Sequence, residues 1–321
     1  MLSYRKKGYT FTQAYKRGHW DGYIRLLAPN GRFAAGLVPW LVKRFVAEGL
    51  PIEVIDERPP RLGLSGGFLD YSNKASLRPY QEQAIQVALK EERGGIQHPT
   101  GAGKTIVMCD LIRRIGYRAL VLVHRKDLLS QTINSFKEQL DTNKTGIIGD
   151  GKWQPEEITV ATFQTLYRRL TDYTNDVRAG ILWMTTIGQV HVDEAHHLPA
   201  ETYGKVMSLL PNAQFRFGYS ATMFKDEKDK ETMFKVMSWT GPIIHSEKSA
   251  DLIKDEKLVP ATVFMISTPK HGLTFDNYQQ AIGVGIVDNY SRNTKIIHLA
   301  RKLEESNTGP VLISVQRVLH G

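Results

Sequence analysis

The sequence predicts an α/β protein in which helices flank a parallel β-sheet. From residue 77 to about 241, helical stretches alternate with short β-branched runs such as ALVLVH (119–124) and ITVATF (158–163). This alternation is typical of parallel strands joined by helical crossovers. The chain has 321 residues, which is long enough for two or three domains, and its hydrophobic share of 41% is enough for packed cores.

A small α/β module is expected ahead of this sheet, over residues 1–56. Pro29-Asn30-Gly31 is a strong turn signal between two apolar runs. Further on, apolar residues recur at helical spacing around Pro39, a residue type favoured in the first turn of a helix. The predicted elements are strands at 22–27, 32–37 and 51–56 and a helix at 37–45.

Pro- and Gly-rich stretches predict the remaining domain boundaries. Residues 57–76 contain Pro59-Pro60 and several glycines and serines, which predicts a linker. A complete sheet domain is then expected at 77–241, and the α/β pattern restarts after Gly241-Pro242. The second, partial domain at 242–321 is predicted to hold strands at 261–267 and 310–315 and a helix near 288–305.

The N-terminal 47 residues concentrate the positive charge of the chain. They hold nine Lys or Arg and one acid, Asp21, which makes the segment +8 when the whole chain is +9. A basic end on a near-neutral body predicts contact with a polyanion, most simply nucleic acid. The alternative is a solvated basic face that has no partner.

Cysteine usage and hydropathy indicate in which cellular compartment the protein is expected. The single cysteine, Cys109, excludes an internal disulfide and suits a reducing cytosol. Its expected role is that of a small buried hydrophobe in a helix. The sequence has no run of roughly 18 apolar residues, and its basic N-terminus lacks an apolar signal core. We therefore expect a cytoplasmic protein that has no membrane partner.

The stretch HPTGAGKT (98–105) has the composition and context of a phosphate-binding loop, because it follows a short strand-like run and precedes an apolar helix. Its glycines let backbone amides close around phosphate oxygens at a helix N-terminus. Lys104 would reach the β- and γ-phosphates of ATP, and Thr105 would ligate Mg²⁺. The strict pattern has glycine where this chain has His98. The expected ATP-binding residues here are Thr100, Gly101, Ala102, Gly103, Lys104 and Thr105.

The stretch DEAH (193–196) follows a second strand-like run, 89 residues after Lys104. Asp193 is expected to hold Mg²⁺ directly or through water. Glu194 is expected to act as general base toward the attacking water. Acids at an exposed helix start are the alternative, and pairing with the phosphate-binding loop argues against it.

These motifs together resemble the superfamily 2 helicases, and the UvsW-type DNA helicases of tailed phages most closely. The most specific part of the resemblance is residues 15–45, with the core RGHWDGYIRLL (17–27). The opening strand and helix of that group's N-terminal domain have no counterpart here. The resemblance implies P-loop RecA-like domains, ATP and Mg²⁺ as cofactors, and branched, duplex or single-stranded DNA as partner in recombination or repair. For a phage-encoded member, the compartment would be the host cytoplasm.

The resemblance also gives a role to SAT (220–222), which follows the strand-like run FRFGY. In these helicases the corresponding motif couples the nucleotide state to domain movement. The resemblance therefore implies that Ser220, Ala221 and Thr222 form a coupling motif, and that the two hydroxyls bond toward His196.

RPYQEQA (78–84) resembles the adenine-recognising motif of the same helicases. The amide of Gln81 has the donor and the acceptor that pair with an adenine edge. Tyr80 or Arg78 would stack on the base or clamp it. The alternative is an ordinary helix start with Pro79 in its first turn.

Three further stretches are expected to face nucleic acid, because each follows a strand or forms a glycine turn: HRKDLLSQ (124–131), GDGKW (149–153) and TFQTL (162–166). Each alone is also compatible with a solvated loop. The expected contacts to backbone phosphates are His124, Arg125, Gln131, Lys152, Thr162 and Gln164, with Lys16, Arg17 and Arg25 in the N-terminal module.

The C-terminal region differs from the family pattern. Family members carry arginines in a late motif of the form QxxGRxxR, and nothing after Thr222 matches it; QRVLHG (316–321) has Gln and Arg in the wrong register. About 80 residues follow Gly241, fewer than the roughly 150 of a RecA-like domain. We expect little ATP hydrolysis and no unwinding from this chain alone, with a second subunit or a further C-terminal region completing the motor.

Three other functions remain open from the sequence alone. Motor subunits of restriction enzymes and transcription-repair helicases share the DEAH and SAT motifs. A non-unwinding protein that binds ATP and DNA is the third. Intact Lys104, Asp193 and Glu194 argue against an inactive first domain.

Overall fold

The computed structural model forms two compact units, Met1–Val259 and Pro260–Gly321. The residues that it describes are 2–58, 76–140, 144–172, 177–198, 201–224, 229–260, 262–267, 274, 277–306 and 309–314. The predicted linker at 57–76 lies almost wholly outside them. No helix in this described part of the chain is long and apolar enough to cross a membrane.

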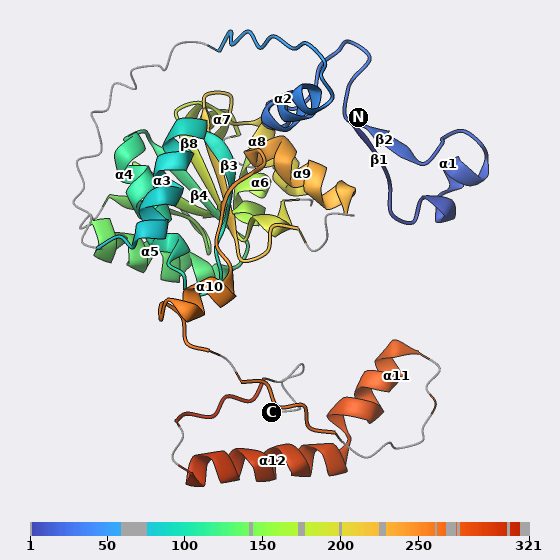
Figure 1. Cartoon of the computed structure of the whole chain (residues 1–321), viewed down its shortest axis with the longest axis vertical. Helices are drawn as coiled ribbons and strands as arrows, with labels where there is room; N and C mark the ends of the chain where they lie inside the picture. The colour runs from blue at the N-terminus through green and yellow to red at the C-terminus, as the bar shows by residue number, and fades with distance from the viewer. Residues whose placement is uncertain are drawn as a thin grey trace. The chain divides into compact units, whose positions relative to one another are not determined.

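An eight-stranded sheet forms the centre of the first unit (Figure 1). Every pairing is parallel except that between the last two strands, β5 and β6. The strand order is β10 (Ile243–Ser246), β3 (Arg93–Gln97), β9 (Phe215–Ser220), β8 (Gln189–Asp193), β4 (Ala119–Val123), β7 (Ile158–Thr162), β5 (Thr145–Gly149) and β6 (Lys152–Gln154). The parallel sheet and the strands predicted at 119–124 and 158–163 are confirmed.

Helices cover both faces of this sheet, so the central strands are buried on both sides. In β4, Ala119, Val121 and Val123 pack on one face, and Leu120 and Leu122 on the other. The first face is covered by α3 (Pro79–Glu91), α4 (Lys104–Ile115) and α5 (Lys126–Leu140). The second is covered by α6 (Phe163–Thr171), α7 (Val177–Met184), α8 (Glu201–Ser208) and α9 (Lys230–Thr240).

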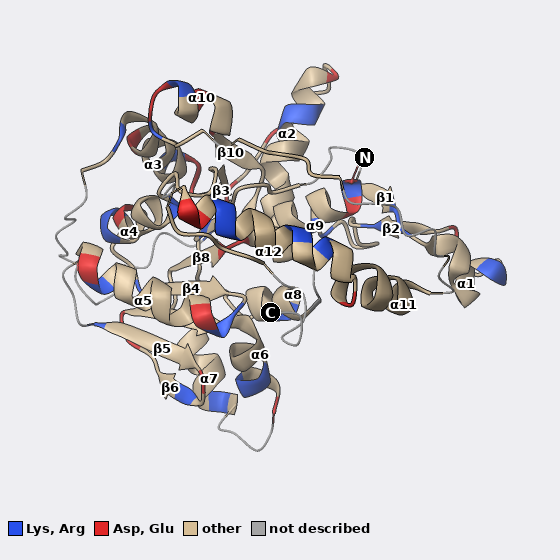
Figure 2. Ribbon diagram, turned by 90° about the horizontal axis from the view of Figure 1, so that it is seen from below, with Lys and Arg blue, Asp and Glu red and all other residues tan. Residues whose placement is uncertain are grey.

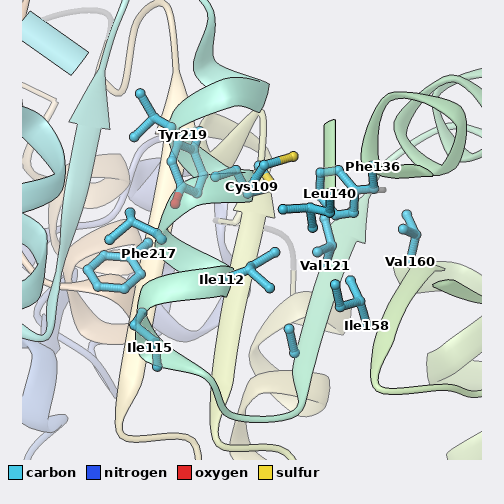
Figure 3. Packing of buried hydrophobic residues seen from close by; sticks show 14 of the residues in the cluster. Cys109, Ile112, Ile115, Val121, Phe136, Leu140, Ile158, Val160, Phe217 and Tyr219 are labelled. Atoms are coloured by element: carbon cyan, nitrogen blue, oxygen red, sulfur yellow. The ribbon is translucent and has the colours of Figure 1, made fainter. Parts of the chain in front are cut away.

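Cys109 lies in α4 among the side chains of the first core (Figure 3). It is fully buried, and burial raises the pKa of its thiol far above the ordinary value. The prediction that Cys109 is a small buried hydrophobe is confirmed.

The N-terminal module differs from its predicted layout. Its strands are β1 (Ser3–Arg5) and β2 (Tyr23–Arg25), which pair antiparallel, and its helices are α1 (Gln13–Lys16) and α2 (Val38–Ala47). The predicted strand at 22–27 and the helix starting near Pro39 are confirmed. The strands predicted at 32–37 and 51–56 are wrong, because Ala35–Leu37 is a 3₁₀ turn and 51–56 has no regular structure.

The physical reason is a tertiary contact between this module and α9. Leu37 is fully buried against Phe234 and Met237 of α9, and Trp40 meets the Phe234 ring edge-on at 5.2 Å between centroids. A polar pair adds to the contact, because the Lys7 Nζ lies 2.7 Å from the carboxylate of Asp229. Burial on a helix outweighs the local strand preference of residues 32–37.

Gly36 allows the closest approach between the module and α9. A Cβ on Gly36 would collide with the carbonyl oxygen of Met237 and would lie 2.8 Å from that of Ser238. We expect Gly36→Ala to lower the melting temperature by roughly 2–10 °C, because backbone atoms on both sides must move. Gly283→Ala is the matched control, since nothing lies within 4 Å of that position. Equal melting curves for the two variants would contradict the tight contact.

The first unit extends further than the boundary predicted at residue 241. β10 pairs with β3 at the edge of the sheet and is followed by α10 (Ser249–Lys254), so residues 242–259 belong to the first unit. The predicted boundary is therefore wrong. The Gly241-Pro242 pair lies in the turn between α9 and the edge strand β10, and it does not mark the end of the domain.

The described part of the second unit is helical. It contains α11 (Tyr278–Ile282), a π-helical turn (Gly283–Val287) and α12 (Tyr290–Glu305). The helix predicted near 288–305 is confirmed. The strands predicted at 261–267 and 310–315 are not present over 262–267 and 310–314. A strand needs a hydrogen-bonded neighbour, and the second unit holds no other strand within its described residues.

Candidate nucleotide and nucleic-acid site

Three predicted motifs meet at one edge of the sheet because their strands are neighbours. HPTGAGKT follows β3, SAT begins at the end of β9, and DEAH begins at the end of β8. These strands are adjacent in the order β3-β9-β8 and run parallel. Their carboxyl ends therefore place the three loops side by side, where ligands bind in open α/β sheets.

The phosphate-binding loop has a backbone that only glycine adopts readily. Gly101 and Gly103 have φ angles of 80° and 79°. A Cβ on Gly103 would also collide with the side-chain amide of Gln81. Lys104 begins α4, and its Nζ donates to the backbone oxygens of His98 and Pro99 at 3.3 and 3.5 Å. The glycine conformations thus form a tight loop over which the Lys104 ammonium lies.

Two of the three residues predicted to recognise adenine, Tyr80 and Gln81, bind the phosphate-binding loop in this structure. Gln81 is 2% exposed; its oxygen accepts from the Arg78 backbone N–H at 2.9 Å, and its nitrogen donates to the Ala102 oxygen at 3.1 Å. The Tyr80 hydroxyl donates to the same oxygen at 2.8 Å. Arg78 donates to the Tyr80 hydroxyl and to the backbone oxygen of Lys257. The base-recognising role of these three residues stays a prediction.

The DEAH and SAT motifs are joined through one serine hydroxyl. The Ser220 Oγ lies 2.9 Å from His196 Nδ1 and 3.3 Å from Glu194 Oε2. His196 Nδ1 also lies 3.2 Å from that carboxylate oxygen. Thr222 meets Ser220 Oγ through its backbone N–H and carbonyl. The predicted contact from His196 to Ser220 is present, whereas Thr222 supports Ser220.

Glu194 is held in a strained backbone conformation. Its φ and ψ are 49° and 52°, the left-handed region that few non-glycine residues adopt. Its backbone N–H donates to the Asp193 carboxylate at 3.0 Å, which stabilises this turn. Strain of this kind persists where the surroundings impose it, as at functional sites. The turn directs Glu194 toward Ser220 and His196.

Asp193 and Lys104 form the charged centre of the site. Burial raises the pKa of Asp193, the negative charge of Glu194 raises it further, and Lys104 opposes the shift. A buried carboxylate beside a second carboxylate favours a bound cation. Thr105, the residue after Lys104, supplies a hydroxyl in the first turn of α4. The donor set and the glycine cradle of the loop fit a Mg²⁺-nucleotide.

His98 has partners that the sequence did not reveal. It is fully buried, its Nε2 lies 3.0 Å from Nδ1 of His245 on β10, and its ring meets Tyr80 edge-on at 5.5 Å. Its own Nδ1 has no hydrogen-bond partner within the described residues. Burial lowers the pKa of His98 to about 4, and His245 and Lys104 contribute to the shift. The departure from glycine at this position was the only sequence signal.

This buried histidine predicts acid sensitivity. The pKa of His98 is about 4 in the folded chain and 6.5 in the unfolded chain, so the unfolded chain binds more protons between these values. Its contribution to stability is complete above about pH 6.5 and is lost as the pH falls toward 4. We expect His98→Leu to reduce the loss of unfolding free energy between pH 8 and pH 5 by about 2 kcal/mol. Urea unfolding at both pH values measures this.

The control for this prediction is His19→Leu, at an exposed position in the N-terminal module. That variant keeps the wild-type pH dependence. The prediction is wrong when His98→Leu and the wild type lose the same unfolding free energy on acidification.

The loops predicted to face nucleic acid lie at the same edge, on the other half of the sheet. The order β8-β4-β7-β5-β6 brings their strand ends together. Gln164 Nε2 donates to the His124 backbone oxygen at 3.1 Å, and Lys126 Nζ lies 3.1 Å from Asp150 in the β5–β6 turn. Arg125, Gln131, Lys152 and Gln164 are exposed, and His124 is half-buried.

Thr162 is an exception among these predicted contacts. Its side chain is only 3% exposed, and its hydroxyl donates to Thr165 at 2.9 Å. A buried hydroxyl with an internal partner does not reach a phosphate. The expectation of a direct contact is therefore wrong for the Thr162 hydroxyl, which is bonded instead to the side chain of Thr165 in the first turn of α6.

The basic residues predicted in the N-terminal module are all exposed. Figure 2 shows a blue, basic segment on α1. Lys16 and Arg17 lie at the end of α1. Arg25 is paired with Asp21 through two hydrogen bonds. Lys16 and Arg17 therefore project their charge to solvent, whereas that of Arg25 is partly balanced.

Comparisons with known proteins divide the chain in the same way as its motifs. Residues 1–52 match the family described as DNA helicase UvsW, N-terminal, and residues 74–225 match Type III restriction enzyme, res subunit. The ATP-dependent DNA helicase uvsW of Enterobacteria phage T4 is 24% identical over 350 residues, covering 100% of this chain and 66% of that protein. The chain is therefore similar to the UvsW-type superfamily 2 DNA helicases over residues 1–52 and 74–225.

Two further comparisons extend this assignment. DNA 3'-5' translocase XPB2 of Sulfurisphaera tokodaii is 32% identical over 212 residues, covering 65% of this chain and 43% of that protein. A crystal structure of T4 UvsW superimposes with a TM-score of 0.60 at 22% identity, covering 95% of this chain and 63% of that one. This likeness shows that the UvsW-like chain has the RecA-like α/β fold. The chain spans less than two thirds of the length of these curated relatives.

Proposed function

We propose that this UvsW-like chain is the ATP-binding and ATP-hydrolysing part of a DNA-dependent helicase or translocase, with ATP and Mg²⁺ as its cofactors. The observation that carries the proposal is the convergence of Lys104, Asp193 and Glu194 at one edge of the sheet, with Glu194 joined to Ser220. Similarity to this helicase family implies nucleotide use. The choice of ATP and Mg²⁺ is supported by the glycine cradle and the buried carboxylate.

The roles of the residues follow from their positions. The amides of the loop from Thr100 to Gly103 and the ammonium of Lys104 hold the β- and γ-phosphates. Thr105 and Asp193 would hold Mg²⁺, which neutralises charge on the phosphates when bound. Glu194 orients a water molecule in line with the γ-phosphate and accepts its proton. Its contacts to Ser220 and His196 fix the carboxylate for that step.

DNA would bind along the exposed loops after β4 and β7, with the basic N-terminal module adding charge. The choice of DNA as the nucleic acid is supported by the match of residues 1–52 to a DNA helicase family. A restriction-type motor subunit is the second candidate, supported by the match of residues 74–225 to a res subunit. The N-terminal match favours the helicase over the restriction-type subunit, because residues 1–52 match a domain of a DNA helicase.

The test is ATP turnover with no nucleic acid, single-stranded DNA, branched DNA and RNA of matched length, measured on the chain joined to a complete second RecA-like domain because little turnover is expected without one. We expect DNA to raise turnover, branched DNA the most, and RNA the least. Equal turnover in all four conditions would contradict a DNA-dependent motor. Absence of Mg²⁺-ATP binding by equilibrium dialysis would contradict the nucleotide site itself.

The basic N-terminal module provides a prediction of its own. We expect Lys16→Ala with Arg17→Ala to weaken DNA binding, because exposed cations that neutralise phosphates release counterions. The slope of log affinity against log salt should decrease by about 0.9 for each duplex phosphate that the protein no longer neutralises, or about 1.8 for two. Lys90→Ala, an exposed lysine on α3, is the control. An unchanged slope in the double variant would show that α1 is only a solvated face.

A further inference from the structure

Two histidines, His124 and His197, lie between the proposed DNA-binding loops and the proposed general base. His124 directly follows β4, and its backbone oxygen accepts a hydrogen bond from Gln164. Gln164 lies in the first turn of α6, after β7, the neighbouring strand in the sheet. The His124 ring lies 4.3 Å from that of His197, with an angle of 36° between the planes. His197 belongs to the 3₁₀ turn that follows β8.

The contacts continue from His197 into the hydrolytic site. The rings of His196 and His197 are 4.2 Å apart. His196 Nδ1 in turn lies 2.9 Å from the Ser220 hydroxyl and 3.2 Å from the Glu194 carboxylate. An unbroken series of contacts therefore crosses the ends of four adjacent strands, β7, β4, β8 and β9.

Core packing does not account for this stack. His197 is exposed, and aromatic rings that only fill a core are buried. Nδ1 of His124 is buried and has no hydrogen-bond partner within the described residues. The His124 ring is thus held by its contact with His197 and by its backbone. A shift of the loop after β4 would move that ring against His197.

The loop after β4 also carries the proposed phosphate contact. Arg125 is exposed, directly follows His124, and donates to Asp127 in the absence of nucleic acid. A phosphate would compete with Asp127 for the guanidinium, because both are anionic acceptors. A phosphate that binds Arg125 would therefore act on the residue next to His124, in the same loop.

We propose that His124 and His197 are positioning residues that transmit nucleic-acid binding to Glu194 through their stacked rings and His196. The proposal rests on the proposed function and adds the route by which DNA accelerates hydrolysis. Neither histidine touches the nucleotide or the attacking water. A series of packed side chains can carry energetic coupling between two sites, and the stacked rings form such a series.

The experiment compares His197→Ala with His197→Phe in the full chain joined to a complete second RecA-like domain. Four quantities are measured: turnover without DNA, maximal turnover with DNA, the DNA concentration at half-maximal turnover, and the melting temperature. We expect His197→Ala to keep basal turnover and half-saturating DNA but to lose DNA stimulation by about fivefold or more, the lower end of coupling factors between sites. Phenylalanine retains the ring contact, so His197→Phe should keep most of the stimulation.

Arg125→Ala separates binding from coupling. This variant should raise the half-saturating DNA concentration while reaching near-normal turnover at saturation. Full stimulation in His197→Ala would overturn the proposed route and leave the proposed function standing. Equal losses in the Ala and Phe variants, or a shared fall in melting temperature and basal turnover, would also overturn it. A wild-type chain that is not stimulated by DNA would overturn the proposed function, and the route with it.

Discussion

Glu194→Gln is expected to abolish most ATP hydrolysis while leaving Mg²⁺-ATP binding near the wild-type level. Glutamine has nearly the shape of glutamate, so the contacts to Ser220 and His196 can persist. An amide does not accept a proton from the attacking water, however. Loss of a general base lowers turnover by roughly 10²–10⁴-fold. Steady-state phosphate release and equilibrium nucleotide binding measure the two quantities separately, in the chain joined to a complete second RecA-like domain.

Glu91→Gln is the matched control for this prediction. Glu91 is an exposed carboxylate at the end of α3, and the substitution makes the same chemical change outside the site. We expect that control to hydrolyse ATP at the wild-type rate. Unchanged turnover in Glu194→Gln would remove Glu194 from the reaction and leave the site a binding site only.

Much of this edge of the sheet was predictable because each motif is local in sequence. A strand, a glycine turn and a helix start within a few residues encode the loop at 98–105. DEAH and SAT are local as well, because each begins at the last residue of a strand, β8 and β9. Because parallel strands share one carboxyl edge, predicting the strands was nearly enough to predict that these motifs converge.

Contacts between distant segments were not predictable in this way. His98 pairs with His245, 147 positions later, on a strand whose place in the sheet has no local signal. The same strand moved the domain boundary from residue 241 to 259. Residues 32–37 have the composition of a strand, yet they pack on α9, almost 200 positions away. Local strand propensity does not decide the conformation where burial against a remote helix contributes more to stability.

The sequence also did not predict which side chains of the nucleic-acid-facing loops are exposed. Sequence placed Thr162 and Gln164 together as contacts, but their side chains differ in exposure because they lie on either side of a helix start. The sequence gives no signal for His197, because a histidine directly after DEAH matches no motif. Its relation to His124 depends on which strands are neighbours in the sheet.

Lys104→Ala is expected to weaken Mg²⁺-ATP binding by roughly 10- to 150-fold, the range for loss of a charge-assisted hydrogen bond worth about 1.5–3 kcal/mol. The ammonium of Lys104 donates to the backbone oxygens of His98 and Pro99, so it already lies over the loop. Titration with a fluorescent, non-hydrolysable ATP analogue measures the affinity. Lys137→Ala, an exposed lysine on α5, is the control for loss of one positive charge.

Gly103→Ala tests the same loop without changing its charge. A methyl group there would meet the amide of Gln81 and would require a φ of 79° that alanine rarely adopts. The loop must then open or shift, and the amides that would hold the phosphates lose their alignment. We expect an affinity loss comparable to that of Lys104→Ala, with Lys104 itself intact. Wild-type affinity in both variants would show that ATP does not bind at this loop, whatever its resemblance to a phosphate-binding motif.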